Sequence, residues 1–292
     1  MGNRVAIVGA GLAGSEAALQ LARRGIHVGL YEMRPHRPTP VHKTAYCAEL
    51  VCSNSLKGTK PETAAGMLKE ELAVLDSALY RTAIEHSVPA GGALAVDREA
   101  FARAVTDEIN ADDRINLLHE EVASVEKLVE THDAVVLATG PLTSDALAGS
   151  IERLVGGYLA FYDAAAPIVS ADSLDMNVLF RQSRYEDAGE AGNAGRGDYL
   201  NAPFTKDDYE QFVDALLAAQ RVIARDFERK DLFQACQPIE EIARAGRDAP
   251  RFGPLKPVGL TDPRTGKRPW AALQLRAEDA SGSCYNLVGF QK

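Results

Sequence analysis

Two cysteines lie five residues apart in the stretch CAELVCSNSLKG, residues 47–58, in a chain that has four cysteines in all. A thiol can act as a nucleophile, ligate a metal or pack as a small apolar side chain. The four cysteines form no CxxC pair, so we expect no zinc site. Cys52 precedes Ser53-Asn54-Ser55, residue types that cap helix N-termini, where a thiolate is stabilised. Cys52 is therefore a candidate nucleophile, with a buried structural thiol as the alternative.

A second candidate thiol, Cys236, lies in the stretch QACQPIEEIAR. Pro238 suits the first turn of a helix, so Cys236 would lie just before a helix N-terminus, whose dipole favours a thiolate. A thiolate adds to electron-poor carbon atoms, which makes both Cys52 and Cys236 candidates for covalent catalysis. The pattern leaves open that both are structural. Cys47 and Cys284 have less distinctive neighbours, and we expect them to be structural.

A glycine-rich turn follows a short apolar strand at residues 4–8 and precedes a helix at about 15–24. In such a turn the first glycine permits a tight bend, the second lets backbone amides approach a pyrophosphate, and the third lets helix and strand pack closely. A second strand, 27–32, ends in Glu32, an acid that can bond a ribose hydroxyl. This order predicts dinucleotide binding rather than a purely structural turn. The predicted cofactor-binding residues are Glu32 and the turn itself, Gly9, Ala10, Gly11, Leu12, Ala13 and Gly14.

Three features favour FAD over a nicotinamide dinucleotide. The turn begins at residue 9, very near the N-terminus, and a later apolar strand, DAVVLATG at 133–140, ends in an Ala-Thr-Gly turn. Both are typical of flavoproteins with this fold. Glu32 also disfavours NADP, whose ribose phosphate needs a cation at this position.

Apolar periodicity predicts the elements that position these residues. Residues 61–82 and 207–227 have the amphipathic pattern of long helices. RPWAALQLR and CYNLVGFQK, late in the chain, read as strands. A β-α-β unit occupies the first thirty or so residues, and the pattern changes after about Pro141. The sequence thus predicts two regions of different architecture.

Composition limits the classes of protein. The chain has 292 residues, of which 46% are hydrophobic and 25% charged, enough for one large domain or two ordinary ones. No apolar run reaches the length of a membrane span and no signal peptide is evident, so we expect a cytoplasmic protein without membrane contact. A net charge of −9 argues against a wholly basic nucleic-acid binder. Residues 221–276, however, hold 12 Lys/Arg against 7 Asp/Glu, which indicates either a solvated face or a phosphate-contacting surface.

The only tryptophan, Trp270, lies within a basic segment at residues 253–276. A flat ring beside cations suits a planar anionic ligand or a nucleotide base. The alternative, which the pattern favours, is a basic loop with Trp270 packed in the core. The cations near it in sequence are Lys256, Arg264, Lys267, Arg268 and Arg276.

Several segments together resemble one family. GAGLAGSEAA, LYEMRP, ELVCSNSLK, VPAGGALAVDR, CQPIEEIA, FGPLKPVGL and TGKRPWA are similar to segments of the folate- and FAD-dependent tRNA (uracil-54) C5-methyltransferases, the TrmFO family, which is related to the GidA-type tRNA-modifying flavoproteins. The resemblance runs from Val5 to Gln291. It implies an α/β fold with a Rossmann-like FAD-binding domain at 1–145. An inserted, smaller α+β domain at 146–292 would bind substrate and RNA.

The resemblance also implies a reaction. Methylenetetrahydrofolate would supply a one-carbon unit that reaches C5 of uridine 54 in the tRNA T-loop by way of reduced FAD, and NAD(P)H would be the reductant. Cys52 and Cys236 match the family's two functional cysteines. One would be the nucleophile at uracil C6 and the other an acid/base group, and the resemblance does not decide which cysteine has which role. Trp270 falls in a segment where the family places folate near the flavin.

Three alternatives stay open at the level of sequence. They are the same chemistry on ribosomal RNA, a chain that binds nucleotide or RNA without turnover, and an ordinary FAD oxidoreductase. The family pattern continues beyond VGFQ at 288–291, including a segment that closes the FAD site over the flavin ring. We therefore expect the second domain to be incomplete at its C-terminal end. The sequence predicts no oligomeric state.

Overall fold

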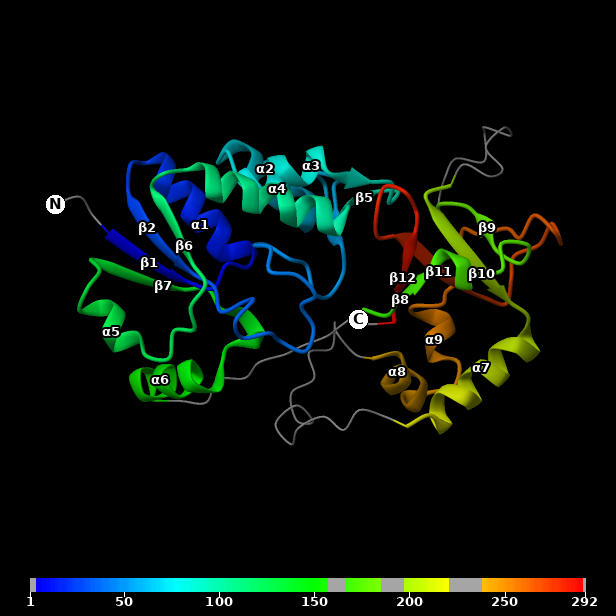
Figure 1. Ribbon diagram of the computed structural model, residues 1–292. Coiled ribbons are helices and arrows are strands. Elements are labelled where there is room, and N and C mark those ends of the chain that lie inside the picture. Colours follow the sequence, from blue (N-terminus) through cyan, green and yellow to red (C-terminus); the bar gives the residue numbers. More distant parts are fainter. Residues whose placement is uncertain (1–3, 157–165, 185–196, 221–237, 291–292) are drawn as a thin grey trace. The chain divides into compact units, whose positions relative to one another are not determined.

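The computed structural model describes residues 4–156, 166–184, 197–220 and 238–290 (Figure 1). These residues form two compact units. The first comprises Met1–Ser87 and Val96–Asp163, and the second comprises Val88–Ala95 and Ala164–Lys292. Each unit has its own sheet and its own buried clusters, so each is described separately below.

A parallel sheet of four strands forms the centre of the first unit, in the order β6-β2-β1-β7 (Figure 1). Strand β1 runs through the middle, and four of its five residues are buried, as expected for a parallel strand covered on both faces. The predicted β-α-β unit is present, with α1 connecting β1 to β2. The elements are β1 (Arg4–Val8), α1 (Leu12–Arg23), β2 (His27–Tyr31), β6 (Ile115–Leu118) and β7 (Ala134–Leu137).

Helices cover both faces of this sheet. On one face Ala6 and Val8 of β1 pack against Val125 and Leu128 of α5 and against Leu147 of α6. On the other face α1 contacts β1, β2 and β6, and α4 contacts β6. The helices of this unit are α2 (Ala64–Val74), α3 (Ala78–Glu85), α4 (Arg98–Ala111), α5 (Val125–Val129) and α6 (Asp145–Val155), with the 3₁₀ turn η1 at Gly140–Leu142.

The helix predicted at 61–82 is two helices, so that prediction is wrong in its continuity. Asp76 has φ +52°, a left-handed conformation that ends α2. Ser77 then accepts a hydrogen bond from the Tyr80 amide and caps the start of α3. The apolar periodicity continues across this break, which is why it conceals the new helix start.

An antiparallel sheet of five strands, in the order β8-β12-β11-β10-β9, forms the second unit. One face of the sheet is apolar and carries Leu200, Leu275 and Tyr285. The helices α7, α8 and the segment before β11 enclose a second cluster around Tyr209 and Val213. The elements are β8 (Ile168–Ser170), η2 (Ala171–Ser173), β9 (Phe180–Arg181), β10 (Tyr199–Phe204), α7 (Lys206–Ala218), α8 (Ile239–Ala245), α9 (Ala249–Phe252), β11 (Ala271–Ala277) and β12 (Cys284–Val288).

The fold class predicted from the sequence is confirmed: the first unit is an α/β, Rossmann-like fold and the second is α+β. The two late strands are present as β11 and β12, and α7 covers residues 207–218 of the helix predicted at 207–227. Three short strands complete the described elements: β3 (Ser55–Gly58), β4 (Ser87–Val88) and β5 (Ala93–Val96). Helix α6, beyond residue 145, belongs to the first unit. The roles predicted for 1–145 and 146–292 stay predictions. No helix in the described part of the chain is long and apolar enough to cross a membrane.

Candidate functional site

The glycine-rich turn between β1 and α1 has space on one side and close packing on the other. Gly9 has φ +97°, a conformation that favours glycine, and a Cβ there would lie 2.7 Å from the Ala138 carbonyl oxygen. A Cβ on Gly14 would lie 1.8 Å from the Gly9 carbonyl oxygen, so α1 can approach the turn only with glycine at position 14. A Cβ on Gly11 would meet no described heavy atom within 4 Å. The open side at Gly11 is where a ligand can come close to the backbone.

The start of α1 faces this open side. Gly11 is the N-cap residue of α1 and offers no side-chain acceptor to the first amides of the helix. No acidic residue occupies the first turn of α1. The N-terminal end of a helix carries partial positive charge and unpaired amides, and both favour a bound phosphate.

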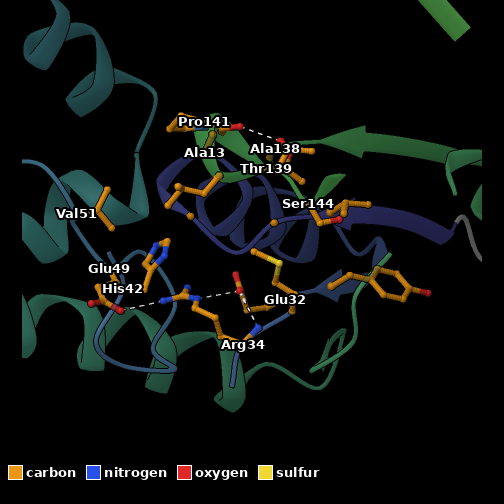
Figure 2. A pocket seen from close by; sticks show the side chains of 18 of the residues that line it. Ala13, Glu32, Arg34, His42, Glu49, Val51, Ala138, Thr139, Pro141 and Ser144 are labelled. Carbon is orange, nitrogen blue, oxygen red and sulfur yellow. Dashed lines mark hydrogen bonds and ion pairs between the residues drawn. The ribbon is translucent and has the colours of Figure 1, made fainter. Parts of the chain in front are cut away.

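A cavity of about 360 Å³ opens beside the turn, and its wall is drawn in Figure 2. It lies at the carboxyl ends of β1, β2 and β7. In the sheet β1 has β2, the next strand reached from it along the chain, on one side and β7 on the other. Ligands of open α/β sheets bind at such a divergence of neighbouring strands. The wall combines the glycine-rich turn, the end of β2, the loop at 42–53 and the segment 138–144.

Glu32, at the end of β2, is buried in this wall with most of its acceptor capacity in use. Its Oε2 accepts a hydrogen bond from the Ala10 amide (3.1 Å), and its Oε1 accepts from the amide (3.1 Å) and Nε (2.9 Å) of Arg34. A carboxylate offers about four acceptor positions, so one remains on Oε2 for a ribose hydroxyl. Burial raises the pKa of Glu32, but the hydrogen bonds and charge of Arg34 and the Ala10 amide outweigh it and lower the pKa. Glu32 is therefore ionised at neutral pH.

Arg34 is the site residue that the residue patterns did not reveal. Its side chain is 4% exposed, and Figure 2 shows it between Glu32 and Glu49. Its guanidinium donates to Glu49 Oε2 (2.9 Å) and to the carbonyl oxygens of Thr44 (3.1 Å) and Tyr46 (3.1 Å). Arg34 therefore ties the acid at the end of β2 to the loop at 42–53. The only signal in the sequence was the motif LYEMRP, in which a cation closely follows the strand-ending acid.

The loop at 42–53 is held by a second carboxylate. Glu49 accepts hydrogen bonds from the backbone amides of Lys43 (2.8 Å) and Thr44 (3.2 Å) and from the Thr44 hydroxyl (2.7 Å). The Ala48 amide donates to the Ala10 carbonyl (2.8 Å), which fastens the loop to the glycine-rich turn. Because Cys52 lies just after this fixed segment, its position relative to the cavity is set by these bonds.

The structure separates the two cysteines of the first candidate stretch. Cys52 is exposed and lines the cavity. Cys47 is fully buried, and burial together with the nearby charge of Glu32 raises the pKa of its thiol to about 11. Cys47 is thus protonated at neutral pH and structural, as its setting in the sequence predicts.

The predicted reason for an activated Cys52, a helix cap at residues 53–55, is wrong. Residues 53–55 lead into strand β3 and do not cap a helix. Asn54 is buried and donates through its side chain to the Val96 carbonyl (2.9 Å), while Ser53 Oγ accepts from the Ser55 amide (3.2 Å). These side chains satisfy local turn and strand groups, so no helix dipole acts on Cys52 from this segment.

Cys236 lies outside the described residues, so the structure does not report whether the two candidate thiols come together. The helix predicted to follow it is present: α8 begins at Ile239, with Pro238 as its N-cap. Among the residues in the described ranges, no group of three His, Cys, Asp or Glu side chains could hold a metal ion.

Trp270, in the second unit, has cations against its ring, but not those nearest in sequence. The Arg251 guanidinium carbon lies 3.9 Å from the ring centroid and Lys206 Nζ lies 5.8 Å from it. Arg264 instead pairs with Asp262 (3.0 Å), and Arg276 is buried on β11. The ring also packs against the apolar cluster around Tyr209. The packing of Trp270 against an apolar cluster agrees with the structural reading, while a ligand at its ring stays a prediction.

Comparisons with known proteins agree with this architecture. The family model described as glucose inhibited division protein A matches residues 4–292. Relatives named methylenetetrahydrofolate–tRNA-(uracil-5-)-methyltransferase TrmFO include proteins of Bacillus licheniformis and Geobacter sulfurreducens, 53% identical over 292 and 291 residues. The alignments cover 100% of this chain but only 64% and 65% of those two relatives.

A solved structure has the same fold. GidA of Aquifex aeolicus matches with a TM-score of 0.59 at 13% sequence identity, over 99% of this chain and 49% of that one. At this low identity the likeness concerns the fold, and it supports the Rossmann-like assignment of the first unit.

Proposed function

Because the chain belongs to the glucose-inhibited division protein A family, we propose that it serves the FAD- and folate-dependent C5-methylation of uridine 54 in the T-loop of tRNA. Relatives at 53% identity carry a name that states folate-dependent uracil methylation of tRNA. The observation that carries the proposal is the presence of an exposed thiol, Cys52, in the wall of a cavity built on a dinucleotide-binding turn. The proposed setting is the cytoplasm, where tRNA is modified.

The residues of the first unit fit FAD. The open side at Gly11 and the first amides of α1, those of Leu12 and Ala13, would hold the pyrophosphate. The remaining acceptor position on Glu32 would bond a ribose hydroxyl. When bound, FAD supplies the redox and one-carbon transfer chemistry, with NAD(P)H as reductant and methylenetetrahydrofolate as donor. The chain's contribution is to bind, orient and shield these reactants.

A thiol supplies the activation of the uracil. A thiolate attacks C6, forming an S–C6 bond, and the electron pair of the C5=C6 bond moves to C5, which becomes nucleophilic. After C5 has gained its carbon substituent, a base removes the C5 proton and the S–C6 bond breaks, restoring the double bond and the thiolate. We assign the roles of nucleophile and base to Cys52 and Cys236 as a pair and do not specify which cysteine has which role. The exposure of Cys52 at the cavity supports its part in either role.

The direct test is product analysis. Protein loaded with FAD is incubated with methylenetetrahydrofolate, NADPH and unmodified tRNA, and nucleosides are quantified by mass spectrometry. We expect 5-methyluridine at position 54, and none in a tRNA with cytidine at that position. Formation of 5-methyluridine in ribosomal RNA but not tRNA would contradict the proposed substrate. Loss of product in Cys52→Ala with unchanged FAD binding would separate a chemical role from a structural one.

A covalent adduct gives a second test. T-arm RNA containing 5-fluorouridine at position 54 cannot lose the C5 substituent as a proton, so the S–C6 bond should persist. Mass spectrometry of the adduct would identify the attacking cysteine. An adduct at neither Cys52 nor Cys236 would overturn the assignment of the thiols.

A further inference from the structure

The second unit carries an arginine whose guanidinium is in cation–π contact with two aromatic rings. The guanidinium carbon of Arg251 lies 3.9 Å from the ring centroid of Trp270 and 5.3 Å from that of Phe252. Its Nε donates a hydrogen bond to the Trp270 carbonyl oxygen (2.7 Å), which fixes the plane of the guanidinium. The flat group is thus held by its contact with the Trp270 ring and by one nitrogen, and its two terminal nitrogens remain to bond a ligand.

Among the described residues, no carboxylate forms an ion pair with Arg251, whereas neighbouring arginines have acid partners. Arg247 pairs with Asp214 (2.6 Å) and Arg264 with Asp262 (3.0 Å). An arginine held in place without an acid partner is a ready donor for a phosphate, since the guanidinium fork matches phosphate geometry.

Phe252, the next residue, is exposed where an aromatic ring of its size is normally buried. Its exposed fraction is 75%, the second largest among the exposed large apolar side chains described. The backbone that carries it is fixed: the Leu255 amide donates to the Pro250 carbonyl (2.8 Å), and both of these residues are buried. The ring is therefore presented to solvent from an anchored turn and not from a loose loop.

An exposed ring beside an unpaired, oriented guanidinium matches the needs of an unpaired nucleotide. A base stacks on an aromatic face whatever its identity, and the adjacent cation contacts the phosphate. Lys206, with Nζ 5.8 Å from the Trp270 ring, is a second cation beside this ring, but it pairs with Glu210 (3.6 Å), so the charge available to a phosphate is that of Arg251. The chain as a whole carries a net charge of −9, so attraction of a phosphate here depends on Arg251 and not on the overall charge.

We propose that Arg251 and Phe252, supported by Trp270, form a binding site at which an unpaired nucleotide of RNA stacks. Phe252 provides the face for the base, and the terminal nitrogens of Arg251 bond the adjoining phosphate. This proposal rests on the proposed function, because the RNA that binds is taken to be the T-loop of tRNA. It adds the surface of the second unit that would contact this loop.

Binding of fluorescently labelled RNA tests the site without requiring catalysis. The probe is a T-arm stem-loop, and the comparison is a fully paired RNA duplex with the same number of phosphates. In Phe252→Ala we expect affinity for the stem-loop to fall on the order of tenfold, with little change for the duplex. In Arg251→Gln affinity for both should fall, and the slope of log affinity against log salt should decrease by about 1.

Matched controls come from the same unit. Met176→Ala removes another exposed apolar side chain, 52% exposed, and Arg244→Gln removes an arginine that already has a partner, Glu241 (3.8 Å). Both should bind the stem-loop as the parent does. Because Trp270 is the only tryptophan, its emission gives a second readout. The stem-loop should quench it in the parent protein and much less in Phe252→Ala.

The outcomes separate this site from the proposed function. Equal stem-loop affinity in Phe252→Ala and Met176→Ala would overturn the site, while 5-methyluridine formation would stand or fall in its own assay. Absence of stem-loop binding by the parent protein would also overturn it. If Phe252→Ala changed self-association by light scattering but not RNA affinity, the surface would be a protein contact and the proposal wrong.

Discussion

At the scale of single residues, the candidate site depends on how buried charges are paired. Glu32 is held by Arg34, and Arg34 is shared with Glu49, so a carboxylate–guanidinium–carboxylate chain lies in the wall of the cavity. Removing one member leaves a buried charge partly unpaired, which costs more than the pair contributes. Glu32 therefore compensates the charge of Arg34 in addition to the ligand binding proposed for it.

Replacement of Glu32 should affect both stability and ligand binding. Glu32→Gln leaves Arg34 with one acid partner and should lower the free energy of unfolding at pH 7 by about 3 kcal/mol. It should also weaken binding of FAD or ADP, measured by calorimetry. Glu99→Gln, which removes an exposed partner of Arg103, is the control and should change little.

The same pair predicts a pH dependence. The pKa of Glu32 is lowered in the folded protein from 4.5, so its stabilisation is complete above about pH 4.5 and is lost as the pH falls through the folded pKa. The difference in unfolding free energy between the parent and Glu32→Gln should therefore shrink below that pH. A difference that grew on acidification would contradict an ionised, Arg34-bound Glu32.

Thiol reactivity should differ sharply between the two cysteines of the first candidate stretch. Cys52 is exposed, whereas Cys47 is fully buried with a pKa of about 11. In native protein at pH 8, iodoacetamide should modify Cys52 and leave Cys47 unmodified, as mapped by peptide mass spectrometry. Modification of Cys47 should require urea. Native modification of Cys47 at the rate of Cys52 would show that the loop at 42–53 is not fixed as described.

At the scale of elements, the spacing of the glycines in the β1–turn–α1 unit produces both close packing and an open backbone surface beside the cavity. Gly14 allows α1 to pack closely against the turn, and Gly11 leaves the backbone open on the side of the cavity. The sequence pattern alone does not distinguish these two glycines. The distinction rests on what lies within reach of an added Cβ: the Gly9 carbonyl in one case and open space in the other.

Two alanine substitutions should separate these roles. Gly14→Ala should destabilise the fold by about 3 kcal/mol, because its Cβ cannot be accommodated 1.8 Å from a carbonyl oxygen. Gly11→Ala should cost about 1 kcal/mol at most and yet weaken FAD or ADP binding on the order of tenfold. Chemical denaturation and calorimetry measure the two quantities. Equal effects of both variants on stability would refute the division of roles.

At the scale of the whole molecule, the candidate cofactor site lies within one unit and the candidate RNA site within the other. The first unit contributes the glycine-rich turn at residues 9–14, the carboxylate of Glu32 and the exposed thiol of Cys52. The second contributes a sheet with its own core and the stacked Arg251 on its surface. Each site can therefore be perturbed and measured separately.

FAD should protect the first unit selectively. At a concentration of about 100 times its dissociation constant, a ligand that binds only the folded state stabilises it by about 2.7 kcal/mol. Amide hydrogen exchange should slow at the turn 9–14 and the loop 42–53, and should be unchanged in β10 and β11. Equal slowing in β11 would show that the cofactor acts on both units.

The sequence by itself determined the β-α-β unit, the glycine-rich turn with a strand-ending acid after it, and the family, because these depend on local spacing. Glycines at fixed offsets and an acid at a strand end need no distant partner to be recognised. Other features were decided only by the tertiary structure. It made Cys47 inert through burial, led Ser53-Asn54-Ser55 into a strand, divided the helix predicted at 61–82, and placed Arg251 rather than its sequence neighbours on Trp270. Burial and stacking join residues that are far apart in the chain, so no local pattern encodes them, whereas the break between the two helices is local and was concealed by the continuous apolar periodicity.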